Sequence, residues 1–149
     1  MLSGLVSHPH QFNMNLSIKE LVQGFNSGDL GGVKAIINAL LADLPYETYQ
    51  NQSEGFYHSW LHFMFQLVGV HLQSEVHMSR GRADIVVQTA THVYVFEFKF
   101  NKTAQEALDQ IVKKGYAAKY QASKKILVGI GVNFDEATRK IDGWLDKTF

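Results

Sequence analysis

The chain has 149 residues, of which 46% are hydrophobic, and its 14 basic and 14 acidic side chains cancel to a net charge of zero. This length and apolar fraction suit one domain with a substantial core, and they exclude a largely disordered chain. No apolar run approaches the roughly 20 residues that span a bilayer, and the absence of cysteine excludes disulfides, thiolate metal sites and cysteine nucleophiles. Because no secretion signal opens the sequence, we expect a cytoplasmic protein.

The first 50 residues predict an arm followed by two helices. Ser17 and Glu20 have the spacing of a capping box, which predicts a helix from Ser17 to about Phe25. A second helix is predicted over residues 30–43 by apolar residues at helical spacing. Neither helix carries evident chemistry, so we expect residues 1–50 to form an N-terminal arm and helical extension to a domain at residues 51–149.

The next segment predicts one helix and three strands. Residues 54–71 have helical periodicity, after which the period changes from 3.6 to 2 and predicts strands at 72–79, 83–87 and 93–100, joined by short turns. The expected apolar face of the helix consists of Phe56, Trp60, Phe63, Met64, Leu67 and Val68.

The last third of the chain predicts a crossover and a return to the sheet. Thr103 and Glu106 form a second capping box, which opens a helix to about Tyr120. A buried strand follows at residues 124–132, and the residues from Thr138 onward predict either a last strand or a short helix. A three-strand meander followed by a helix and a strand implies an α/β fold, with a mixed sheet flanked by helices.

The strongest strand carries a charged pair in an apolar setting. Glu97 and Lys99 point to one face of the strand, whereas the three phenylalanines within residues 96–100 point to the other. A hairpin that turns at residues 89–92 brings Asp84 opposite this pair. Two carboxylates and an amine form a hard oxygen site suited to Mg²⁺ or Mn²⁺, with the lysine placed to position a water. The alternative is an edge strand with a solvated Glu–Lys pair.

The neutral total hides an uneven distribution of charge. Residues 99–125 carry seven lysines and two acidic residues, whereas residues 54–98 carry two basic and four acidic residues. A track along a nucleic-acid backbone is one interpretation of this segment, and a solvated basic helix is the other. The residues expected to contact nucleic acid are Lys102, Lys113, Lys114, Tyr116 and Lys119.

The spacing of these acids and the lysine resembles a known signature. Asp84, followed after twelve residues by Glu97, Phe98 and Lys99, resembles the D-x(n)-E-x-K pattern of the PD-(D/E)xK nuclease superfamily, although Ala83 stands where the name has proline. The predicted order of elements is similar to the restriction-endonuclease-like core of that superfamily. The resemblance implies a metal-dependent nuclease that hydrolyses phosphodiester bonds in DNA or RNA, with DNA favoured.

The resemblance also implies a role for individual residues. Asp84 and Glu97 would be ligands of Mg²⁺ or Mn²⁺, and Lys99 would be the amine that positions the attacking water. Glu54 would be an auxiliary carboxylate and a further metal ligand, and Gln110 would be a catalytic helper from the crossover helix.

Neighbouring segments are similar to one branch of the superfamily. That branch contains uncharacterised domains found C-terminal to AAA-ATPase-like domains, and the similar segments are residues 53–58, 81–84 and 107–120. The resemblance therefore implies an AAA-ATPase-like domain as a partner, and a homodimer is common among nucleases that cut both strands. Some members pair the helix glutamine with a tyrosine four residues on, where this chain has Lys114. The alternative function is a non-catalytic module that binds nucleic acid or a partner and regulates an ATPase-containing protein.

Two weaker patterns point to other chemistry. Glu54, His58 and His62 lie on one helix face, but they span about 12 Å, so a zinc site would need a further ligand such as His71 or His77. The glycines at residues 129 and 131 resemble part of a dinucleotide-binding loop, but the third glycine of that loop is missing.

Overall fold

The computed structural model describes residues 14–42, 54–79 and 82–149, and within the last two ranges it describes the side chains of residues 57–77 and 84–149. The described residues begin with the helices α2 (Met14–Ser27), α3 (Leu30–Ala42) and α4 (Glu54–Val68). These helices are followed by β1 (Gln73–Ser79), β2 (Arg82–Gln88), β3 (His92–Phe100), α5 (Ala104–Lys113), α6 (Tyr116–Tyr120), a 3₁₀ turn (Gln121–Ser123), β4 (Ile126–Asp135) and β5 (Lys140–Thr148).

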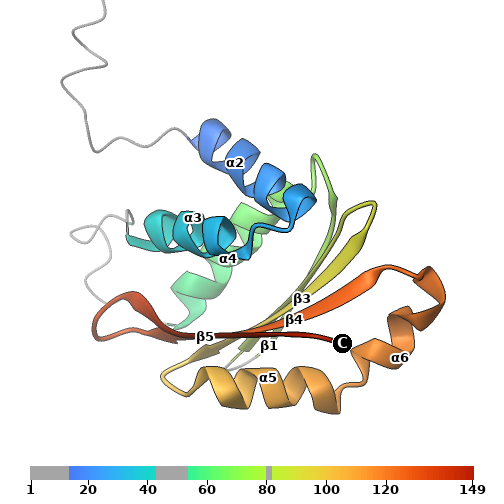
Figure 1. Ribbon diagram of the computed structural model, residues 1–149. Coiled ribbons are helices and arrows are strands. Elements are labelled where there is room, and N and C mark those ends of the chain that lie inside the picture. Colours follow the sequence, from blue (N-terminus) through green and yellow to red (C-terminus); the bar gives the residue numbers. More distant parts are fainter. Residues whose placement is uncertain (1–13, 43–53, 80–81) are drawn as a thin grey trace, which may run out of the picture.

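The five strands form one mixed sheet in the order β1-β2-β3-β4-β5. Strands β1, β2 and β3 form an antiparallel meander, β3 and β4 are parallel, and β5 is antiparallel to β4. Figure 1 shows α2, α3 and α4 on one face of the sheet and α5 with α6 on the other. The predicted α/β fold with a mixed sheet flanked by helices is confirmed, and the C-terminal residues form a strand rather than a helix.

The larger core lies between the sheet and helices α2, α3 and α4. Phe25 of α2 packs against Tyr94 of β3 with ring centroids 5.1 Å apart, and the Tyr94 hydroxyl donates a hydrogen bond of 2.8 Å to the Phe25 carbonyl oxygen. Burial raises the pKa of the Tyr94 hydroxyl. The N-terminal helices thus share a core with the sheet. The boundary predicted near residue 50 lies outside the described residues and stays a prediction.

Two details of the predicted helices are wrong. Helix α2 already includes Met14, so Ser17 lies inside it rather than at its N-cap. Phe63, expected on the apolar face of α4, is 46% exposed, whereas Met64 and Val68 of that expected face are buried. The described residues that α4 buries are Tyr57, Leu61, Met64, Phe65 and Val68. No helix in the described ranges is both long and apolar enough to cross a bilayer.

Helix α5 packs on the opposite face of the sheet. Thr103 is its N-cap, as predicted, and accepts a hydrogen bond of 3.1 Å from the Glu106 backbone N–H. The predicted single helix to Tyr120 is instead interrupted, because Gly115 has a φ of +71°, a left-handed conformation that ends the helical path. The backbone of α5 approaches β4 closely at Gly131, where an added Cβ would lie 2.5 Å from the Ala104 carbonyl oxygen. The smaller core of this face contains Val86, Val93, Val95, Ile111 and Leu127.

Candidate functional site

Two carboxylates meet across neighbouring strands on the face that α5 covers. Asp84 of β2 and Glu97 of β3 are direct partners in the antiparallel register, and their residues are 7% and 0% exposed. The hairpin between them turns at residues 89–92, where the Thr89 N–H donates to the His92 carbonyl oxygen at 2.9 Å. The structure therefore brings these two residues together as the sequence predicts.

Two lysines complete what we call the charge cluster, which consists of Asp84, Glu97, Lys99 and Lys114. Lys99, two residues along β3, places its Nζ 3.7 Å from Glu97 Oε1. Lys114, at the end of α5, hydrogen-bonds through its Nζ to Asp84 Oδ2 and, at 3.2 Å, to Glu97 Oε2. Lys114 thus bridges the two carboxylates, whereas Lys99 lies beside one of them beyond hydrogen-bond distance.

Burial, together with the proximity of Asp84, changes the protonation of Glu97. The pKa of Glu97 is raised from 4.5 to about 7, first by burial and then by the hydrogen bond and charge of Asp84, whereas Lys114 acts in the opposite direction. Two carboxylates this close resist joint ionisation, because each destabilises the charge on the other. A cation that contacts both would relieve this repulsion.

The donor set of the cluster fits a divalent metal ion. Carboxylate oxygens are the ligands that Mg²⁺ and Mn²⁺ prefer, and Asp84 and Glu97 present theirs from rigid neighbouring strands. Within the described side chains, no group of three acidic or histidine residues forms a complete ligand set. Glu54, the predicted further ligand, begins α4, and its side chain lies outside the described residues.

The remaining predicted catalytic residue, Gln110, lies on α5. The Gln110 side chain is half-buried, and the backbone carbonyl oxygen of Gln110 accepts a hydrogen bond of 3.0 Å from the Lys114 backbone N–H. The helper role expected of the Gln110 side chain stays a prediction.

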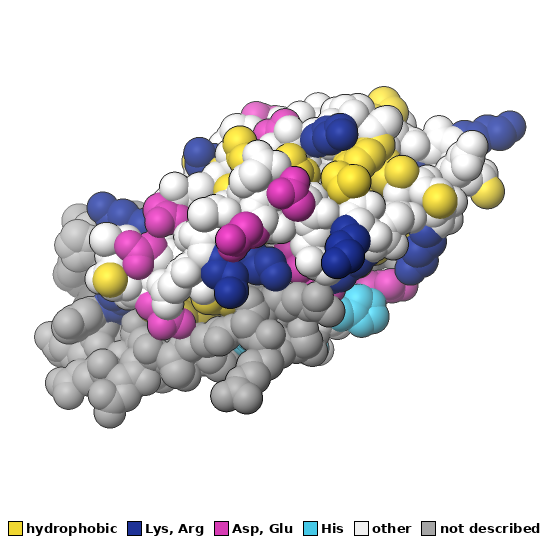
Figure 2. Space-filling view, turned by 90° about the horizontal axis from the view of Figure 1, so that it is seen from below, with side chains coloured by type: hydrophobic (Ala, Val, Ile, Leu, Met, Phe, Trp, Pro, Cys, Tyr) yellow, Lys and Arg dark blue, Asp and Glu magenta, His cyan; other side chains and the backbone are white. Residues whose placement is uncertain are grey.

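The residues expected to contact nucleic acid fall into two groups. Lys102, Lys113 and Lys119 are exposed, and Tyr116 stacks on Tyr120 with ring centroids 6.4 Å apart. Lys114 differs from them, because its ammonium lies inside the charge cluster rather than on an open surface. Figure 2, which views the molecule from below, shows Lys and Arg side chains interspersed with acidic ones rather than gathered into one basic patch.

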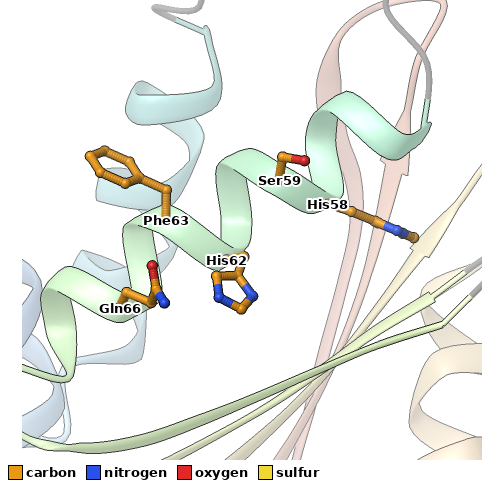
Figure 3. Close-up of a pocket in the computed structure, with 5 residues that line it drawn as sticks. All are labelled: His58, Ser59, His62, Phe63 and Gln66. Atoms are coloured by element: carbon orange, nitrogen blue, oxygen red, sulfur yellow. The ribbon is translucent and has the colours of Figure 1, made fainter.

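The histidine face of α4 lines a pocket of about 400 Å³. Figure 3 shows His58 and His62 pointing toward the strands, at separate positions along the helix, while Phe63 points to the other side. His58 packs edge-on against Phe100, with ring centroids 4.8 Å apart. His77, one of the predicted additional zinc ligands, instead lies 3.7 Å from Glu75, and the described residues bring no third ligand to this face.

Two features near the cluster were not predicted from the sequence. Asn133 is 2% exposed and pairs in register with Lys99; it accepts a hydrogen bond from the Lys102 N–H at 2.8 Å and donates one to Asp142 at 2.6 Å. A polar residue within an apolar strand was the available signal. The only feature of the sequence that pointed to the position of Lys114 between the two carboxylates was that it lies four residues after Gln110.

Comparisons with known proteins found a family model and a curated relative that match the chain. A family model described as the PD-(D/E)XK nuclease superfamily matches residues 52–144. A curated relative, "Uncharacterized protein in vnfD 5'region" of Azotobacter chroococcum mcd 1, is 34% identical over 125 residues, which are 80% of this chain. The chain spans about a quarter of that relative, since the match covers 24% of its length. No solved structure matches the chain significantly.

Proposed function

The chain belongs to the PD-(D/E)XK nuclease superfamily, and from this premise we propose that it is a metal-dependent nuclease that hydrolyses phosphodiester bonds at the charge cluster. The observation that carries the proposal is the register pairing of Asp84 with Glu97 beneath α5, with Lys99 two residues along the same strand. The family match covers the segment that contains all three residues.

In this proposal the carboxylates of Asp84 and Glu97 hold Mg²⁺ or Mn²⁺. When bound, such an ion lowers the pKa of a water and offsets charge on the phosphate. Lys99 has its ammonium 3.7 Å from Glu97 Oε1, at the margin of the carboxylate pair, where it can orient a water for in-line attack. Glu54 would add a carboxylate from α4, and Gln110 would assist from α5.

The substrate and partners extend the same proposal. We propose DNA ahead of RNA as the substrate, with Lys102, Lys113, Lys119 and Tyr116 along its backbone. An AAA-ATPase-like domain is proposed as a partner, and the much greater length of the curated relative leaves room there for further domains. A homodimer and a cytoplasmic location stay predictions.

Cleavage assays on single- and double-stranded DNA and RNA test the proposal, with Mg²⁺ or Mn²⁺ and with chelator. We expect Asp84→Asn and Lys99→Met to reduce cleavage at least about 100-fold, within the range typical of general acid–base and electrostatic contributions. Matched controls make the same chemical changes at exposed sites, Asp109→Asn on α5 and Lys140→Met on β5. Equal cleavage by Asp84→Asn and the unmodified protein would contradict the assignment.

A non-catalytic binding module is the second candidate, and one observation favours it. The ammonium of Lys114 contacts both carboxylates, as a structural ion pair would. A protein that binds nucleic acid, cleaves none and shows no affinity for Mn²⁺ would support this candidate over the nuclease.

A further inference from the structure

Lys114 lies between the two carboxylates that would hold a divalent cation. Its ammonium contacts one oxygen of Asp84 and one oxygen of Glu97, and its side chain is 20% exposed. An ammonium that bridges two carboxylates makes the same contacts as a metal ion that both of them ligate. The lysine and the metal ion would therefore compete for the same two carboxylates.

The local structure of α5 explains why this lysine reaches the cluster. Lys114 is the C-cap of α5, and its backbone N–H donates to the Gln110 carbonyl oxygen at 3.0 Å. Side chains on a helix point back toward its N-terminus, so a long side chain from the last turn extends over the sheet. The positive charge is also favoured near the C-terminal end of the helix dipole.

The two lysines of the cluster are not equivalent. Lys99 Nζ lies 3.7 Å from Glu97 Oε1, on the opposite oxygen from the one that Lys114 contacts. Lys99 therefore leaves the space between the carboxylates open, whereas Lys114 fills it. With both carboxyls ionised the four side chains carry no net charge, so an added divalent cation would meet strong repulsion from an ammonium that stayed between the same two acids.

We propose that Lys114 is a built-in counter-ion that competes with the divalent metal ion for Asp84 and Glu97, so that metal binding requires its ammonium to leave the cluster. The proposal rests on the proposed function, because it concerns the same metal site. Gly115 directly follows, in a left-handed conformation with nothing within 4 Å of the position of an added Cβ, so open space adjoins the joint between α5 and α6.

The first test measures the affinity for Mn²⁺ by calorimetry on the full chain at pH 8, without nucleic acid. We expect Lys114→Met to lower the Kd for Mn²⁺ at least about tenfold, which corresponds to about 1.4 kcal/mol. Lys113→Met is the matched control, since it removes the adjacent, exposed lysine from the same helix end and should leave the Kd unchanged. Lys114→Arg keeps the positive charge and should bind Mn²⁺ as weakly as the unmodified protein does. Thermal unfolding establishes that each variant is folded.

The second test uses the unmodified protein and so does not depend on the folding of a variant. Acetylation of lysine amines, read by mass spectrometry, should show Lys114 protected without metal and several-fold more reactive with saturating Mg²⁺, while the reactivity of Lys113 stays constant. Unchanged reactivity of Lys114 in the metal-bound protein would overturn the proposal.

The outcomes separate this inference from the proposed function. Equal Kd values for the unmodified protein and Lys114→Met would overturn the competition and leave the nuclease proposal standing. If Lys114→Met binds Mn²⁺ and the unmodified protein does not, the result would support a competition that the lysine wins in the unmodified protein. Absence of Mn²⁺ binding in every variant would overturn both.

Discussion

The buried carboxyl of Glu97 gives the metal-free protein a distinctive dependence of stability on pH. Its pKa is raised from 4.5 to about 7, mainly by burial and by the neighbouring Asp84. A carboxyl with a raised pKa binds its proton more tightly in the folded state than in the unfolded state. Its contribution to stability is therefore complete below pH 4.5 and is lost as the pH rises through about 7, opposite to the usual behaviour of a salt-bridged carboxylate.

The substitution Glu97→Gln isolates this effect, because the amide keeps the shape of the side chain and cannot ionise. The rise in the pKa of Glu97 from 4.5 to about 7 corresponds to about 3 kcal/mol of folding free energy, at about 1.4 kcal/mol per pKa unit. We expect the free energy of unfolding of Glu97→Gln, minus that of the unmodified protein, to increase by about 3 kcal/mol between pH 4.5 and 8. This is a large part of the roughly 5–15 kcal/mol that stabilises a typical domain.

Urea denaturation at pH steps between 4.5 and 8, with chelator present throughout, measures this difference. The ionisation of distant groups cancels, since it contributes equally to both proteins. Glu20→Gln, which changes an exposed carboxyl on α2, is the matched control and should show no comparable gain. A difference for Glu97→Gln that stays constant within about 0.5 kcal/mol would refute the reasoning.

Three further substitutions test the packing around the sheet by urea denaturation. Gly131→Ala should cost about 1–3 kcal/mol, because the new Cβ would lie 2.5 Å from a backbone oxygen of α5; a cost near zero would contradict the close approach. Tyr94→Phe should cost about 1–2 kcal/mol through the lost bond to the Phe25 carbonyl oxygen, and an unchanged midpoint would argue against that bond. Thr103→Ala should cost about 0.5–2 kcal/mol as the N-cap of α5 is lost, whereas Thr103→Ser should retain most of the stability.

The sheet and the carboxylate pair were predictable because local patterns determine them. Alternation along residues 93–100 assigns each side chain to a face, and a short turn at residues 89–92 fixes the register of the hairpin. Together these place Asp84 opposite Glu97, as the structure has it. The cap at Thr103 was predictable for the same reason, since the residues that form it lie three positions apart.

Features that depend on packing between distant segments were not predictable. The exposure of Phe63 depends on how α4 fits the sheet and the N-terminal helices, and aromatic side chains around the helix left the edge of its apolar face ambiguous. The helix predicted to Tyr120 is interrupted at Gly115, and a glycine permits a left-handed conformation without requiring one, so its presence alone did not predict the interruption.

The charge cluster shows this contrast most clearly, because Lys113 and Lys114 are neighbours of the same type that differ in environment. Composition and spacing treat them alike, and both are expected to contact nucleic acid. In the fold, one is exposed and the other bridges two buried carboxylates. The close contact of α5 with β4 at Gly131 contributes to this difference, because it holds the helix near the sheet. Gly131, one of the two glycines that resemble part of a dinucleotide-binding loop, thus allows the close approach of the helix that ends at Lys114.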